Sequence, residues 1–187
     1  MREVFIENVS MTKFGRFDSS LRDLTTSAGE KCLERTRKKI DCLLIGSMNP
    51  EEFSSNSNIS SLVADYLNVQ GIPSMRIETA SSSGAAIFSL GCNLIASGAY
   101  SNILLVAAEK MSGLETQKVT KILAKVIEEE ERQSGASMPS LAAMVTMAYK
   151  LKYKINKELL NELLKTIAIK NHHNGSLNPL AHFQKEI

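Results

Sequence analysis

Short apolar strands that alternate with helices constrain the fold of this chain most strongly. Residues 41–47, DCLLIGS, form a continuous apolar run, which is typical of a strand buried on both faces. Three further segments have the patterning of strands: residues 2–9, 74–80 and 101–111. Helices are predicted between these strands, over residues 20–38, 58–68 and 82–98. This order, with its short connections, predicts an α/β fold with a largely parallel sheet.

The predicted helix over residues 82–98 is apolar on nearly every side. Small residues such as Ala85, Gly91 and Ala96 keep it thin. Because a helix that is apolar all round needs cover on all sides, we expect it to be buried.

The character of the sequence changes after Gly113. Three helices are predicted beyond it, over residues 114–132, 140–152 and 156–171, and the tail after them is predicted to begin as a loop. No strand is predicted there. We therefore divide the chain into an α/β core, residues 1–112, and a helical cap segment, residues 113–187.

Composition excludes several classes of function. The net charge is only +2 and the basic residues are scattered, so no nucleic-acid surface is expected. No apolar run approaches the roughly 18 residues that a membrane span needs. Three cysteines at wide spacing, without a signal peptide, indicate a reducing cytoplasm. The adjacent His172 and His173 lack nearby partner ligands, so no metal site is expected.

The serines in the stretch Ala80–Gly84, ASSSG, have two possible roles. A nucleophile placed just before a helix N-terminus is favoured as an anion, and free N–H groups there stabilise an oxyanion. Alternatively, one of the three serines simply caps the helix. The stretch also approximates a G-x-S-x-G elbow with Ser82 as nucleophile, and histidines lie downstream. A serine hydrolase fits poorly, because the intervening segment is helical and offers no strand to carry the acid.

Five segments in order resemble the N-terminal part of the thiolase superfamily, especially its archaeal and sterol-carrier-protein-like branch. They are MTKFGRF (11–17), IDCLLIGSMNP (40–50), GIPSMRIETASSSGAA (71–86), IASGAYSNILLVAAEKMS (95–112) and KNHHNGSLNPLAHFQKEI (170–187). The resemblance implies acyl transfer between an enzyme nucleophile and coenzyme A. It places Ser81 where thiolases carry the nucleophilic cysteine. A serine hydroxyl needs a strong base, and the sequence shows none nearby.

Cys92 does not substitute for that cysteine, since it lies about three helical turns further along the predicted helix. Like Cys32 and Cys42, it is expected to be a core residue.

The resemblance also implies where a thioester substrate would bind. The thioester lies near Ser81 and Ser83, and Gly84 allows it to approach closely. Met111 lines the pocket, and Met138, in a Ser-Met-Pro loop, contacts the pantetheine arm of an acyl-CoA. No cofactor beyond this coenzyme A thioester is implied.

The catalytic histidine and second cysteine of thiolases come from a C-terminal half that this sequence lacks. The strand predicted at 101–109 is then a long apolar sheet edge, which invites pairing. We therefore expect a homodimer, or a partner chain that supplies a thiolase C-terminal half. Three functions remain open besides the hydrolase: part of a split thiolase-like acyltransferase, an inactive acyl-CoA-binding or regulatory homologue, and a related carbon–carbon lyase. The isolated chain is expected to be inactive or weakly active.

Overall fold

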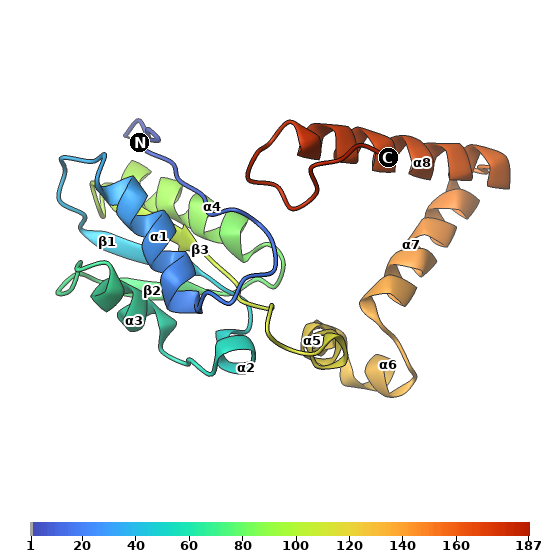
Figure 1. Cartoon of the computed structure of the whole chain (residues 1–187), viewed down its shortest axis with the longest axis horizontal. Coiled ribbons are helices and arrows are strands. Elements are labelled where there is room, and N and C mark those ends of the chain that lie inside the picture. Colours follow the sequence, from blue (N-terminus) through green and yellow to red (C-terminus); the bar gives the residue numbers. More distant parts are fainter. Residues whose placement is uncertain (1) are drawn as a thin grey trace. The chain divides into compact units, whose positions relative to one another are not determined.

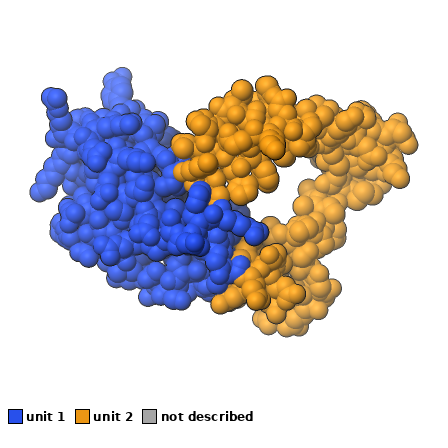
Figure 2. All heavy atoms as spheres, in the orientation of Figure 1, with its two compact units in different colours: residues 1–12, 16–114 blue, residues 13–15, 115–187 orange. Residues whose placement is uncertain are grey.

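The computed structural model describes residues 2–187. The chain forms two compact units, shown in different colours in Figure 2. The first contains residues 1–12 and 16–114, and the second contains residues 13–15 and 115–187.

The first unit contains a three-stranded sheet (Figure 1). Its strands are β1 (Cys42–Gly46), β2 (Ser74–Ile77) and β3 (Ile103–Ala107), in the spatial order β2-β1-β3. Both pairs are parallel, and the register aligns Gly46 with Ile77 on one side and with Ala107 on the other. The predicted α/β fold with a parallel sheet is confirmed.

Helices cover both faces of this sheet (Figure 1). The covering helices are α1 (Leu21–Leu33), α3 (Ile59–Tyr66) and α4 (Ser83–Ala96), and the unit also contains the short helix α2 (Pro50–Ser54). Alternate residues of β1 enter two different clusters: Leu43 and Ile45 pack with residues of α1 and α3, whereas Cys42 and Leu44 pack with Ile87 of α4. All five β1 residues are buried, which explains their continuous apolar run.

The strand predicted over residues 2–9 does not form. Two hydrogen bonds, near its two ends, tie residues 2–10 to the rest of the unit: Arg2 N–H donates to the Ala96 carbonyl and the Ser10 hydroxyl to the Ala28 carbonyl. A strand requires a hydrogen-bonded neighbour, and within the described residues this segment has none. Its side chains are correspondingly exposed, Phe5 to 78% and Val9 to 72%.

The α4 helix is covered on one side only within this unit, so the prediction of burial on all sides is wrong for this chain. Ser83, Ile87 and Gly91 are its buried residues. Gly91 faces the sheet, where an added Cβ would lie 3.0 Å from the Leu105 side chain. Phe88, on another side, is 48% exposed because the described residues offer no second layer to cover it.

The second unit is helical, and its helices differ from the prediction in two places. They are α5 (Thr116–Leu123), the 3₁₀ turn η1 (Ala124–Val126), α6 (Glu129–Gln133), α7 (Met138–Lys152) and α8 (Lys157–Ser176). The helix predicted over 114–132 is broken at Ile127, which adopts an extended backbone and buries its side chain. Burial of this side chain therefore overrides helical propensity.

The α8 helix continues through His172 and His173, where a loop was predicted to begin. Both side chains contact the tail. The His173 Nδ1 atom lies 2.7 Å from the Glu186 carboxylate, and the His172 and Phe183 ring centroids are 5.3 Å apart. None of the helices within residues 2–187 combines the length and apolarity that a bilayer crossing requires.

Candidate functional site

A tight turn joins β2 to α4, and its backbone is strained at Ala80. The φ angle of Ala80 is +52°, a left-handed conformation that costs a residue with a Cβ atom about 1–2 kcal/mol. The Ala80 N–H donates a hydrogen bond to the Glu78 carboxylate, and the Ser82 hydroxyl donates to the Thr79 carbonyl at 2.7 Å. Local hydrogen bonds thus hold the strained turn in place.

Ser83 fixes the turn from inside. Its side chain is buried, its hydroxyl donates to the Ala80 carbonyl at 2.7 Å, and the same oxygen accepts from the Thr79 N–H at 3.0 Å. One serine therefore satisfies a backbone donor and a backbone acceptor at the start of the turn. This is a structural role, and the substrate contact that the resemblance implies for Ser83 stays a prediction.

The turn packs directly on the carboxyl ends of two strands. A Cβ atom on Gly46, at the end of β1, would lie 2.8 Å from the Ser83 carbonyl oxygen. A Cβ atom on Gly84 would lie 3.5 Å from the Cβ of Ala107, at the end of β3. The close approach at Gly46 sets the height of the turn above the sheet, whereas the contact at Gly84 has an ordinary van der Waals distance.

Ser81 stands at the exposed tip of this turn. Its hydroxyl makes no hydrogen bond with any residue from 2 to 187. The N–H groups of Gly84 and Ala85, in the first turn of α4, likewise donate no hydrogen bond within the described part of the chain. The unbonded Ser81 hydroxyl therefore lies just before a helix N-terminus with unbonded N–H groups. Acyl transfer through an oxyanion requires a nucleophile and such donors.

No base is hydrogen-bonded to Ser81 among the residues that the structure describes. All three histidines belong to the second unit, and the nearby Glu78 carboxylate accepts the Ala80 N–H instead. The described residues also contain no group of three or more His, Cys, Asp or Glu side chains that could hold a metal ion. The turn as described presents a nucleophile position without a proton acceptor.

The remaining predicted site residues lie in different parts of the chain. Gly84 joins Ser81 and Ser83 at the turn, whereas Met111 follows β3 in the first unit and is 40% exposed. Met138 begins α7 in the second unit and is 45% exposed. The structure thus brings the turn residues together.

The cysteines show no sign of activation. Burial raises the pKa of the Cys42 thiol, opposed by a hydrogen bond with Tyr100. Burial also raises the pKa of the Cys32 thiol. Cys42 is a core residue as predicted, whereas Cys32 and Cys92 are only partly buried. Higher thiol pKa values leave less thiolate near neutral pH, which argues against either shifted thiol as a replacement nucleophile.

Sequence reasoning missed Glu109, just beyond β3. Its carboxylate accepts hydrogen bonds from the Met48 N–H at 2.7 Å, from the Asn49 N–H at 3.3 Å and from the Ser47 hydroxyl. Glu109 therefore orders the loop that follows β1. This loop lies at the carboxyl ends of the strands, where the turn also lies. The sequence signal is the EKMS stretch at 109–112, in which the resemblance implies a role for Met111 and none for Glu109.

Comparison with known proteins decides the family. The model of the thiolase N-terminal domain matches residues 4–187. The chain belongs to the thiolase family. This agrees with the α/β fold and with the five segments quoted above.

Two curated relatives of this thiolase-family chain are named acetyl-CoA acetyltransferases. The relative from Methanothermobacter thermautotrophicus is 33% identical across 100% of this chain and 49% of its own length. The relative from Methanocaldococcus jannaschii is 32% identical across 98% of this chain and 46% of its own length. The chain thus spans about half the length of these relatives.

A shorter match is to a relative with a different name. A beta-ketoacyl-[acyl-carrier-protein] synthase III from Chlamydia caviae is 31% identical over 46% of this chain and 26% of its own length. The similarity therefore extends to proteins named for a different acyl carrier.

Proposed function

We propose that this chain is one half of a thiolase-like acyl-CoA acyltransferase in which Ser81 occupies the nucleophile position. The observation that carries the proposal is the free Ser81 hydroxyl just before α4, together with the unbonded N–H groups of Gly84 and Ala85. Membership of the thiolase family supports the same proposed function. A partner chain supplies the remaining catalytic groups, and the complex acts in the cytoplasm.

The reaction at the turn is a transesterification. The Ser81 oxygen attacks the thioester carbonyl, a C–O bond forms, and the C–S bond breaks to release coenzyme A. The hydroxyl proton passes to the departing sulfur, and the free N–H groups stabilise the oxyanion between these steps. The names of the two longest-matching relatives favour an acyl-CoA as donor. Gly84, Met111 and Met138 are proposed to contact it.

A second candidate is a protein that binds acyl-CoA without turning it over and thereby stabilises or regulates an active homologue. It is favoured by the lack of a proton acceptor at Ser81 within residues 2–187. Serine at about neutral pH is a weak nucleophile without such a group. The isolated chain is therefore expected to acylate slowly or not at all.

The test compares three forms of the chain incubated with acetyl-CoA: wild type, Ser81→Cys and Ser81→Ala. Intact mass reports the acyl-enzyme, and a thiol reagent reports released coenzyme A. An adduct on Ser81→Cys that is absent from Ser81→Ala supports an acyl-CoA site at the turn. An adduct on wild type as well supports Ser81 as a working nucleophile. If Ser81→Cys takes up no acyl group and none of the three forms binds acetyl-CoA, both candidates fail.

A further inference from the structure

The turn between α7 and α8 gathers exposed apolar side chains. It lies where the end of α7 meets the start of α8 (Figure 1). Leu151 is 73% exposed there, and three further large side chains of the same segment are also exposed: Tyr149, Tyr153 and Leu159. Neither helix contains a buried residue over residues 138–152 and 157–176. We call residues 149–159 the α7–α8 tip.

Hydrogen bonds hold the α7–α8 tip in a defined shape. The Ile155 N–H donates to the Lys150 carbonyl at 2.9 Å, which closes α7 with a Schellman-type cap. Lys154 takes the left-handed position of this cap, with a φ angle of +52°, where glycine is usual. The Asn156 side chain then caps α8 by accepting from the Leu159 N–H at 2.8 Å. The tip therefore presents its side chains from a fixed backbone.

The same tip carries positive charge that no ion pair neutralises. Residues 149–157 contain no acidic residue, and they contain four lysines: Lys150, Lys152, Lys154 and Lys157. None of these lysines forms an ion pair with a residue from 2 to 187. The Lys152 ammonium group lies 5.5 Å from the centre of the Tyr153 ring. Glu158 follows as a single acidic residue, so the tip stays strongly positive.

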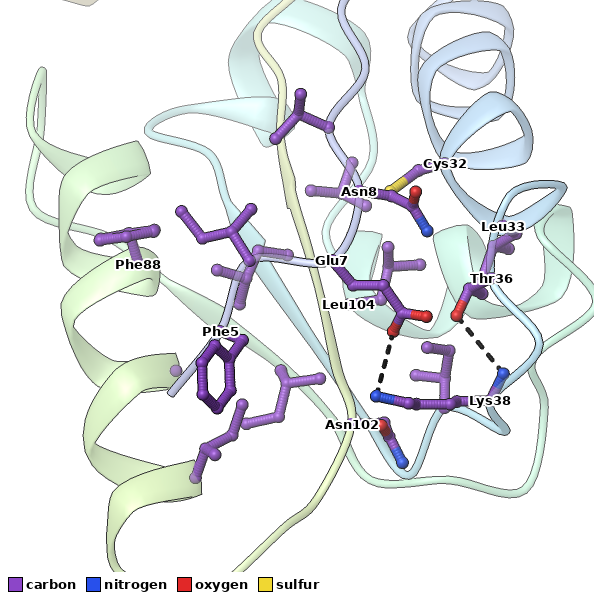
Figure 3. Close-up of a pocket in the computed structure, with 18 of the residues that line it drawn as sticks. Phe5, Glu7, Asn8, Cys32, Leu33, Thr36, Lys38, Phe88, Asn102 and Leu104 are labelled. Carbon is purple, nitrogen blue, oxygen red and sulfur yellow. Dashed lines mark hydrogen bonds and ion pairs between the residues drawn. The ribbon is translucent and has the colours of Figure 1, made fainter. Parts of the chain in front are cut away.

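A cavity beside β3 shows the opposite arrangement of charge. It has a volume of about 440 Å³ and is lined by many apolar side chains, among them Phe5 and Phe88, and by Lys38 (Figure 3). The Lys38 ammonium group is paired there with the Glu7 carboxylate at 3.6 Å. Apolar surface thus occurs together with unpaired lysines at the tip, whereas the cavity neutralises its lysine.

We propose that the α7–α8 tip binds the surface of a lipid bilayer that contains anionic phospholipids. Lysines near such a surface are attracted by its negative potential. Tyr149 and Tyr153 suit the level of the headgroups, where tyrosine is enriched, and Leu151 enters the boundary of the acyl chains. Binding of this kind needs no membrane-spanning helix, and residues 2–187 contain none. It is independent of acyl transfer at Ser81.

Two other occupants fit the tip less well. Protein interfaces are enriched in arginine and depleted in lysine, whereas residues 133–187 contain lysines and no arginine. The acidic run at residues 128–131 of a second copy would match the charge of the tip. However, α6, which contains most of this run, has the sequence EEERQ and offers no apolar side chain to cover Leu151. A bilayer surface matches both the charge and the apolar groups.

Co-sedimentation of the chain with vesicles tests the proposal. We compare vesicles of phosphatidylcholine alone with vesicles in which about a third of the lipid is phosphatidylglycerol. The anionic vesicles are expected to bind at least about tenfold more tightly, and an increase in salt from about 0.05 M to about 0.5 M should remove most of this difference. Each lysine near the surface contributes about fivefold, so Lys152→Gln combined with Lys154→Gln should weaken binding about 25-fold.

A control pair changes the same amount of charge elsewhere in the second unit. Lys118→Gln and Lys121→Gln remove two exposed lysines of α5. They are expected to change vesicle binding by less than about twofold, since charges more than a Debye length from the surface are screened. Thermal unfolding followed by circular dichroism checks that both double variants stay folded.

A tryptophan probe reports which residues enter the bilayer. The chain contains no tryptophan, so Leu151→Trp gives a single reporter at the tip. Leu177→Trp is the matched control, because Leu177 is similarly exposed, at 70%, and follows the other end of α8. The two positions are separated by the 20 residues of α8, about 30 Å of helix. On anionic vesicles, emission is expected to shift to shorter wavelength for Leu151→Trp and to stay unchanged for Leu177→Trp.

Three results would overturn this assignment. The first is equal or absent binding to the two kinds of vesicle. The second is a loss of binding in the α5 control pair as large as in the tip pair, or an emission shift at position 177 alone, since either places the contact elsewhere. The third is retention of the chain by polyglutamate without any vesicle binding, which assigns the tip to an acidic protein. Acylation of Ser81→Cys reports separately on the proposed function.

Discussion

A side-chain carbon on Gly46 would lie 2.8 Å from the backbone carbonyl oxygen of Ser83. This approach joins the last residue of the central strand to the first residue of the helix that carries the candidate site. Because the obstacle is backbone, a side chain at position 46 cannot be accommodated by a change of rotamer. The position of the Ser81 turn above the sheet therefore depends on this glycine.

We expect Gly46→Ala to destabilise the chain by about 1–3 kcal/mol, since overpacking of a tight contact forces the backbone to shift. Urea unfolding followed by circular dichroism measures the change. Gly84→Ala is the matched control, because its Cβ meets Ala107 at an ordinary 3.5 Å and its backbone needs no left-handed φ. Equal losses for the two variants would contradict the role assigned to the Gly46 contact.

Ser83→Ala is expected to cost about 1–3 kcal/mol, because it removes two part-buried hydrogen bonds, one from the Thr79 N–H and one to the Ala80 carbonyl. It is also expected to reduce acylation when combined with Ser81→Cys, since the turn loses its internal support. Thermal unfolding and intact mass measure the two effects. Ser82→Ala, whose hydroxyl is exposed, serves as control and is expected to change both much less.

Glu109→Ala is expected to lower the free energy of unfolding by about 1–3 kcal/mol, because hydrogen bonds to an ionised acceptor are stronger than average. The substitution leaves the Met48 and Asn49 N–H groups without their acceptor. Exchange of these two amides should accelerate in the same variant. Unchanged exchange at Met48 would show that the loop after β1 is held by other contacts.

The α1 helix has a pH-dependent cap. Hydrogen bonds from the backbone and hydroxyl of Ser20 lower the pKa of Asp23 in the folded state. A carboxyl with a depressed folded pKa stabilises the fold above its unfolded pKa of about 3.9, and this contribution disappears as the pH falls through the folded value. The stability difference between wild type and Asp23→Asn should therefore be constant near neutral pH and shrink in acid. Parallel urea titrations from about pH 7 to about pH 3 measure it, and a difference that grows in acid would reverse the assigned sign.

Local patterning predicted much of the candidate site. The composition of Ala80–Gly84 indicated a strand-to-helix turn, and the resemblance to thiolases implied that Ser81 occupies the nucleophile position. The turn is present, with Ser81 at its exposed tip. The distinct role of Ser83 was not predicted, because three adjacent serines look alike in sequence. Only the fold of the turn determines which hydroxyl is buried against Thr79 and Ala80.

The sequence by itself determined the elements whose signals are local: the buried strand at Cys42–Gly46, the helix that follows the serine turn, and membership of the thiolase family. Tertiary structure alone decided that residues 2–9 form no strand and that the predicted helix breaks at Ile127. The physical reason is that a strand is completed by hydrogen bonds from another segment, and a buried side chain can override local propensity. Periodicity reports which face of a segment is apolar, and it carries no information about whether a neighbour is there to cover it.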